Sequence, residues 1–167
     1  MSSSGLNELP LYLIGLVIAF LGFRTLRKKT PSQTIAKVLA RSKYKDYTCW
    51  ITQQSALETG YWKSKIFNDF NNGFGMGVPR IRESLRVGEY LATNGENFST
   101  YKNFEDSVKD YVIWAEYFRM PTNFNRPEQF VEFLESKGYA EDPNYAKKVL
   151  SLIQKNCYWT LYKLYFI

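Results

Sequence analysis

Large and apolar side chains recur every three or four residues along most of this chain. The clearest series begins in residues 46–59 and ends just beyond them, and its members are Tyr47, Trp50, Ile51, Gln54, Leu57 and Tyr61. This spacing predicts an amphipathic helix with one face turned to a core. The same spacing, together with helix-start signals at Asn103 and Pro127, predicts further helices. Their expected extents are residues 33–42, 103–118, 127–137 and 142–153.

The helical period disappears between Val78 and Tyr101. Within this stretch, the pair Asn94-Gly95 is the strongest short signal for a β-hairpin turn. Residues 89–92 and 97–101 are therefore predicted to form the two arms of a small β-lobe that faces the helix at 46–59. The fold class expected from these elements is a mostly α-helical α+β domain with a small β-hairpin lobe.

The segment 9–26 is apolar and contains one charged residue, Arg24. Its length reaches the lower end of the roughly 17–25 residues that span a bilayer. A cleaved signal peptide is the alternative, but the residues before the segment include Glu8 and no Lys or Arg, and no small-residue cleavage site follows. We therefore expect a single transmembrane helix at 9–26.

Positive charge is concentrated directly after this anchor. From Arg24 to Asp46 there are eight basic residues and one acid, whereas beyond Asp46 fourteen basic residues balance fourteen acidic ones. A nucleic-acid-binding protein would carry its excess charge on the domain itself, so no nucleic-acid partner is expected. The cluster is typical of a contact with anionic lipid. By the positive-inside rule it places the domain on the cytoplasmic face of the membrane.

The composition narrows the possible chemistry. The chain has no histidine, which removes Ser-His-Asp and Cys-His nucleophile systems and the usual zinc sites. Cys49 and Cys157 lack a metal-binding spacing, so they either form one disulfide or remain buried free thiols. Carboxylate chemistry remains, and glycoside hydrolysis runs on carboxylates alone. The aromatic content of 17% suits sugar binding as well as a core.

Glu58 is the strongest candidate for such chemistry. It follows Leu57 at the end of the predicted helix, beside the buried face, and Gly60 lies where a left-handed cap would end that helix. A carboxyl group that is partly removed from water has a raised pKa. A general acid that works near neutral pH needs such a pKa. On periodicity alone, the alternative is a solvated glutamate at a helix end.

Five short motifs follow one another along the chain. They are Ala56-Leu57-Glu58-Thr59-Gly60, Asn71 to Gly77, Gly88-Glu89-Tyr90, Phe98 with Tyr101, and Gly138 to Ala146. In this order they resemble the peptidoglycan-cleaving glucosaminidases of glycoside hydrolase family 73, which have a lysozyme-like fold. The resemblance covers residues 34–153 approximately. It implies hydrolysis of a β-1,4 glycosidic bond in peptidoglycan glycan strands, without a metal or an organic cofactor.

The resemblance also implies roles for particular residues. Glu58 would protonate the leaving oxygen, and Glu89 would activate water or stabilise the oxocarbenium-like transition state. Without substrate, we expect Glu58 to be the less exposed of the two. The residues expected to bind the sugar are Asn72, Phe74, Tyr101 and Tyr139. Asn72 and Phe74 have the alternative role of shaping the turn that supports Glu58, and Tyr101 and Tyr139 have that of core packing.

Two positions depart from the family pattern. Glu141 stands where the family usually has threonine, and Tyr61-Trp62 stands where it prefers Trp-Gly. The enzymatic alternative is a muramidase or lytic transglycosylase on the same fold. The alternative from another class is a catalytically inactive structural membrane protein of a virion, which the second departure allows.

The expected organisation has four parts. They are a flexible N-terminus at 1–8, a transmembrane anchor at 9–26, a basic linker at 27–33 and a lysozyme-like glucosaminidase domain at 34–167. A wall hydrolase on the cytoplasmic face would not reach its substrate. Two explanations therefore remain. The first is that the anchor is an exception to the positive-inside rule. The second is that the protein lies in the internal membrane of a lipid-containing virion, with capsid proteins as partners.

Overall fold

The computed structural model describes residues 29–157, and the anchor predicted at 9–26 lies outside them. The chain divides into two units, residues 1–30 and residues 31–167, and the second forms the domain. The part of the chain that the structure describes has no helix with the length and apolar character to cross a membrane. The elements are α2 (Pro31–Leu39), η1 (Lys45–Tyr47, a 3-10 turn), α3 (Thr48–Glu58), α4 (Lys65–Phe70), β1 (Gly88–Leu91), β2 (Asn97–Thr100), α5 (Phe104–Tyr117), α6 (Pro127–Ser136) and α7 (Tyr145–Asn156).

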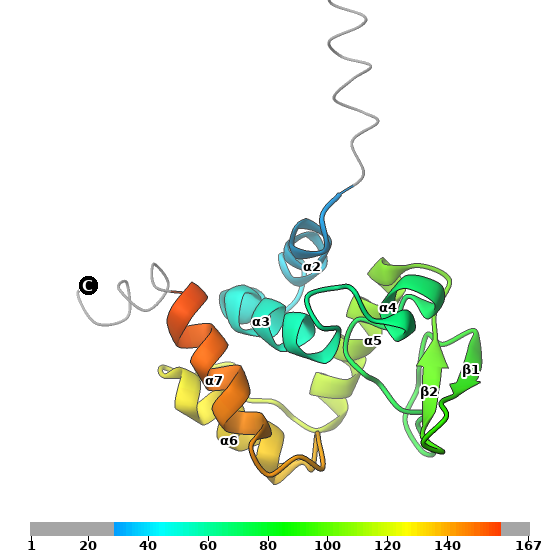
Figure 1. Ribbon diagram of the computed structural model, residues 1–167. Helices are drawn as coiled ribbons and strands as arrows, with labels where there is room; N and C mark the ends of the chain where they lie inside the picture. Colours follow the sequence, from blue (N-terminus) through cyan, green and yellow to red (C-terminus); the bar gives the residue numbers. More distant parts are fainter. Residues whose placement is uncertain (1–28, 158–167) are drawn as a thin grey trace, which may run out of the picture. The chain divides into compact units, whose positions relative to one another are not determined.

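Helix α3 is the central element of the domain and ends on Glu58. It packs directly against α7 and α2 (Figure 1). A second layer follows, in which α6 packs on α7 and α5 packs on α2. The buried side of α3 includes Trp50, Ile51 and Gln54, as its periodicity predicts. The helix predicted for residues 46–59 is confirmed, with η1 as its first turn.

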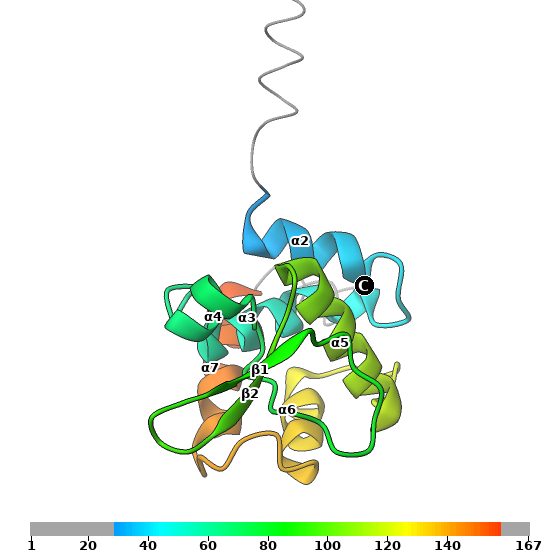
Figure 2. The same ribbon diagram turned by 90° about the vertical axis from the view of Figure 1, so that its right-hand side faces the viewer.

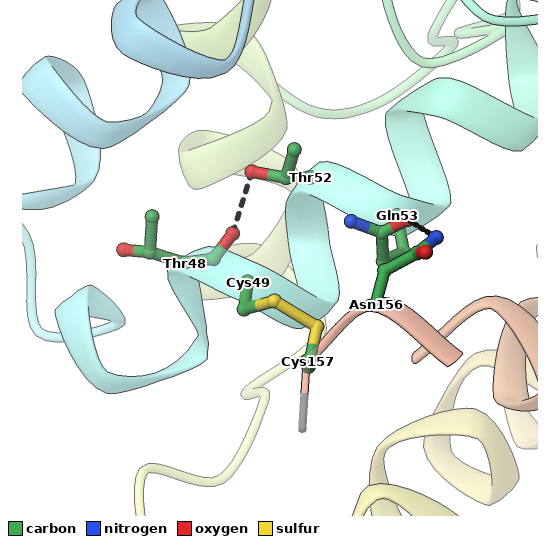
Figure 3. Close-up of a disulfide and its surroundings, with 6 residues drawn as sticks. All are labelled: Thr48, Cys49, Thr52, Gln53, Asn156 and Cys157. Atoms are coloured by element: carbon green, nitrogen blue, oxygen red, sulfur yellow. Dashed lines mark hydrogen bonds between the residues drawn. A yellow bond between two sulfur atoms is a disulfide. The ribbon is translucent and has the colours of Figure 1, made fainter. Parts of the chain in front are cut away.

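A disulfide joins α3 to the end of α7. Cys49 in the first turn of α3 is bonded to Cys157, which follows α7, and the two are 108 residues apart in sequence (Figure 3). Beside it, the Asn156 amide donates a hydrogen bond to Gln53 Oε1 at 2.7 Å. The sequence leaves open whether the two cysteines form a disulfide or remain free thiols, and the structure shows the disulfide.

The predicted hairpin is confirmed. Strands β1 and β2 are antiparallel, with Glu89 opposite Ser99, and they lie on the other side of α3 from α6 and α7 (Figures 1 and 2). Gly95 in the turn has φ +87°, a conformation that favours glycine. Gly77 forms a further antiparallel bridge to Phe98, which attaches the segment before the hairpin to β2.

Helix starts and ends agree with the sequence where a capping residue marks them. Asn103 accepts a hydrogen bond from the Asp106 amide at the start of α5, and Pro127 is the first residue of α6. Helix α2 begins at Pro31, earlier than predicted, because proline suits the first helical position. Helix α4 was not predicted, because six residues are too few for a periodic pattern.

Most aromatic residues within 29–157 belong to the core or pack against it. Tyr111 of α5 stacks on Phe74 at a centroid distance of 4.3 Å, and Trp114 meets the edge of Tyr139 at 4.8 Å. The core extends beneath α3 through Trp50, which is 1% exposed. This packing fixes the turn at residues 72–76 directly below Glu58.

Candidate active site

Glu58 lies at the carboxyl end of α3 with its side chain mostly buried. Its Oε1 accepts a hydrogen bond from the Tyr145 hydroxyl at 2.5 Å. Burial raises the pKa of Glu58 from 4.5 to about 7, and the hydrogen bond from Tyr145 partly opposes that rise. A large fraction of Glu58 is therefore protonated at neutral pH, as proton donation requires.

Tyr145 belongs to a buried chain of hydrogen bonds that begins in α5. The Tyr111 hydroxyl donates to Gln54 Oε1 at 2.7 Å, and Gln54 Nε2 donates to the Tyr145 oxygen at 3.2 Å. The hydroxyl hydrogen of Tyr145 is thereby free for Glu58. Tyr145 is not among the candidate site residues that the sequence predicts, although it lies inside the last of the five motifs.

Helices α3 and α7 are antiparallel and are fastened at both ends. The disulfide joins the start of α3 to the residue after α7, and the Glu58–Tyr145 hydrogen bond joins the end of α3 to the first residue of α7. Glu58 is therefore held by an element that lies 87 residues away in sequence.

Gly75 lies directly against the carboxyl group of Glu58. A Cβ at this position would lie 2.7 Å from Glu58 Oε2, and the residue has φ +61°. Both observations require glycine, because a side chain would collide with the carboxylate and the conformation is left-handed. The glycine thus lets the turn at residues 72–76 pass directly against Glu58.

A cleft of about 670 Å³ opens over Glu58. Its walls come from the end of α3, from β2, from the loop at 138–142 and from the first turns of α7. The cleft is acidic, since Lys148 is the single basic residue among the described residues that line it. Its acidic lining residues are Glu58, Glu96, Glu141 and Asp142.

Glu89 lies on β1 and is more exposed than Glu58, as expected. Its side chain is 43% exposed and forms an ion pair with Arg86 at 2.8 Å. Its other carboxylate oxygen accepts a hydrogen bond from Asn97 Nδ2 at 2.8 Å. Asn97 lines the cleft, whereas Glu89 does not. The structure therefore places the second acid on the hairpin, one side chain away from the cleft.

The structure corrects the sugar-binding role expected for Asn72. The residue is fully buried, and its amide nitrogen donates to the carbonyl oxygens of Met76 and Ser99, both at 2.9 Å. Its Oδ1 accepts from the amides of Phe74 and Met76. Every polar atom of the side chain is engaged in shaping the turn beneath Glu58, which is the alternative role.

Phe74 and Tyr101 also have no surface to offer a sugar. Phe74 is 0% exposed and stacks on Tyr111, while Tyr101 is 3% exposed. The Tyr101 hydroxyl donates to Asp110 Oδ2 at 2.8 Å. Arg82 forms two hydrogen bonds to the same carboxylate, which secures the segment before β1 to α5. Both residues support the site rather than line it.

Tyr139 is the one predicted sugar-binding residue that lines the cleft. Its hydroxyl donates to the Phe74 carbonyl at 2.8 Å, so the polar atom is already engaged. The ring stacks against Tyr145 at a centroid distance of 5.8 Å. What Tyr139 offers a substrate is therefore part of its aromatic surface, which suits a sugar ring.

The departure at Tyr61-Trp62 leaves the turn after α3 intact. Gly60, Tyr61 and Trp62 all have left-handed backbones, with φ between +53° and +61°. The Trp62 amide donates to Thr59 Oγ1 at 2.9 Å, and its indole donates to Ser55 Oγ at 3.3 Å. These contacts offset the cost of a bulky residue in the left-handed region.

A carboxylic acid of raised pKa in an acidic, aromatic-walled cleft on a mostly helical domain is the arrangement that glycoside hydrolases use for a general acid. Residues 33–158 match the glucosaminidase family, described as mannosyl-glycoprotein endo-beta-N-acetylglucosaminidase. The chain belongs to this family.

Individual relatives agree with the family. A peptidoglycan hydrolase, FlgJ of Pseudomonas aeruginosa, is 30% identical over 123 residues, which are 64% of this chain and 30% of that protein. The crystal structure of a peptidoglycan hydrolase from Sphingomonas sp. A1 has a TM-score of 0.59 at 25% identity, covering 80% of this chain and 90% of that one. The glycoside hydrolase domain of FlgJ from Salmonella typhimurium has a TM-score of 0.57 at 26% identity, covering 77% of this chain and 85% of that one.

These comparisons confirm the expected mostly helical, lysozyme-like domain with a small hairpin. The chain spans only about a third of the length of the curated relatives, between 30% and 38%.

Proposed function

We propose that this protein cleaves a β-1,4 glycosidic bond in the glycan strands of peptidoglycan, as an endo-β-N-acetylglucosaminidase. The observation that carries the proposal is the buried Glu58, whose pKa of about 7 lets it protonate the leaving oxygen at neutral pH. The acidic cleft and the ring of Tyr139 form the surface on which the sugars would lie. The names of the relatives support peptidoglycan as the substrate.

Analysis of the released sugar ends tests this function. Purified peptidoglycan would be digested with the full-length protein, and the products would be identified by mass spectrometry. Reducing N-acetylglucosamine ends are expected. Reducing N-acetylmuramic acid ends would instead assign a muramidase, and anhydro ends a lytic transglycosylase. No products at all would favour the inactive structural protein.

For Glu89 we propose the second acidic role, in which it activates water or stabilises the transition state. Its hydrogen-bond partner Asn97 lines the cleft, so the carboxyl group lies one side chain away from it. Glu89→Gln should lower the rate while Glu83→Gln, a change to another exposed glutamate, leaves it unaltered. Equal rates for both variants would assign the second role elsewhere.

We also propose that residues 9–26 anchor the protein in a membrane as a single span. Full-length protein should then stay with membranes during a wash at high salt, because salt screens charge contacts but does not extract a buried apolar helix. Release by salt alone would reduce the segment to a surface contact.

The location of the domain is proposed from two features that point in different directions. The basic cluster after the anchor favours the cytoplasmic face, whereas the Cys49–Cys157 disulfide favours an oxidising compartment. An internal membrane of a lipid-containing virion reconciles them, because the thiols would oxidise after the particle leaves the cell. Alkylation of free thiols tests this arrangement. A disulfide already formed in producing cells would instead support an anchor that breaks the positive-inside rule.

A further inference from the structure

A second groove continues from the cleft on the side away from α7. It shares Gly75, Gly77, Gly138 and Tyr139 with the cleft and has a volume of about 360 Å³. From there it extends over α5, where Trp114, Tyr117 and Phe118 form an aromatic floor. We call it the basic side groove.

The charge of this groove is opposite to that of the cleft. Arg80, from the segment before β1, and Lys137, directly after α6, both line it. Within the part of the chain that the structure describes, no Asp or Glu lines it. Arg82 also lines it, but its guanidinium is paired with Asp110 at 2.9 Å. Neither Arg80 nor Lys137 has an ion pair with an acid of residues 29–157. Two cations are thus available to a ligand.

The floor of the groove is apolar and partly open to solvent. Tyr117 is 44% exposed, and Ile81 on the neighbouring segment is 81% exposed. Exposed apolar side chains of this size beside uncompensated cations are typical of a binding surface for a ligand that is both apolar and anionic.

We propose that the basic side groove binds the acidic peptide stem that peptidoglycan carries on alternate sugars. This inference rests on the proposed function and deepens it. The sugars of a strand are uncharged rings, which the acidic cleft accepts, whereas the stem carries free carboxylates that the cleft would repel. The groove that adjoins the cleft offers Arg80 and Lys137 to those carboxylates, and its aromatic floor to the small apolar side chains between them.

The consequence is a preference for strands that still bear peptides. The full-length protein would be assayed on two forms of the same glycan strands, intact or stripped of stems by an amidase. Each stripped muramic acid keeps one lactyl carboxylate, which lies on the sugar itself, whereas the carboxylates and apolar side chains of the stem are gone. The variants would be Arg80→Gln and Lys137→Gln. Lys155→Gln, which removes an exposed lysine on α7 away from both grooves, is the matched charge control. Thermal unfolding would verify that each variant is folded.

We expect the ratio of kcat/KM on intact strands to that on stripped strands to fall by roughly two- to fivefold in each variant, since an exposed charge contact is worth less than a factor of ten. The fall should reside in KM and should diminish at high salt. Lys155→Gln should keep the wild-type ratio.

Two results would overturn the stem-binding role. One is a wild-type kcat/KM on both substrates in both variants, and the other is an equal loss of kcat/KM on both substrates, which would assign the cations to sugar binding or to folding. Absence of cleavage of either substrate by the wild-type protein would refute the proposed function itself. The two failures are therefore distinguishable.

Discussion

Replacement of Glu58 by glutamine should abolish hydrolysis and at the same time stabilise the folded domain above neutral pH. Burial raises the pKa of this carboxyl from 4.5 to about 7. One pKa unit corresponds to about 1.4 kcal/mol, so ionised Glu58 destabilises the native state by up to about 3 kcal/mol. The glutamine is uncharged at every pH and can still accept the hydrogen bond from Tyr145.

The direction of the effect follows from proton linkage. Between pH 4.5 and about 7 the native state binds more protons at Glu58 than the unfolded state does, because its pKa is higher. The stability of the wild-type protein therefore falls as the pH rises through this window, and the glutamine variant lacks this loss. At pH 8 the variant should be more stable by about 1–3 kcal/mol. In a domain of this size each kcal/mol raises the Tm by about 2–4 °C.

Thermal unfolding of both proteins between pH 4 and pH 9 measures the stability difference, and turbidity clearance of purified peptidoglycan measures the activity. Glu83→Gln, at an exposed position, is the control and should follow the wild type in both assays. Loss of general-acid help should lower the rate by roughly 10²–10⁴. Parallel Tm curves for Glu58→Gln and the wild type would refute the raised pKa. Activity above about a tenth of wild type would refute the role of Glu58 as the acid.

Three further changes test the surroundings of the acid. Gly75→Ala should lower activity at least about tenfold, because its Cβ would lie 2.7 Å from the Glu58 carboxylate. Gly95→Ala is the control, because Gly95 also has a positive φ but has open space around it, and it should lower only the Tm. Equal activity of the two variants would argue against a collision between the new Cβ and Glu58. Tyr145→Phe removes a hydrogen bond that lowers the pKa of Glu58, so the decline of activity at alkaline pH should move to higher pH. An unmoved pH–rate profile would contradict this role. Cys49→Ser should lower the free energy of unfolding by about 2–5 kcal/mol. A reductant should lower the stability of the wild type but not that of the variant. An equal effect of the reductant on the variant would argue against the disulfide.

The sequence predicts well those elements that local interactions determine. The helix that ends at Glu58 was predicted from its apolar period, and the hairpin from Asn94-Gly95, because each pattern specifies a backbone conformation without reference to the rest of the chain. The starts of α5 and α6 were found for the same reason, from Asn103 and Pro127.

Contacts between distant segments could not be predicted in this way. The family motifs include Asn72, Phe74 and Tyr101. Such motifs contain residues that the fold requires as well as residues that touch a substrate. Phe74 stacks on Tyr111 of α5, and Tyr101 is hydrogen-bonded to Asp110 of α5. Asn72 is buried against β2, where it is hydrogen-bonded to the Ser99 carbonyl. Tyr145 was missed for the related reason that its partner, Glu58, lies 87 residues earlier.

The acidity of Glu58 is therefore a property of the whole domain. Its helix supplies the position, but the burial that raises the pKa comes from the turn at Gly75 and from α7, which the disulfide and the Tyr145 hydrogen bond fasten to α3 at opposite ends. An antiparallel helix pair held at both ends resists sliding and separation better than one held at a single end. The disulfide thus restrains the geometry of an acid that lies at the other end of the same two helices, although it takes no part in the chemistry.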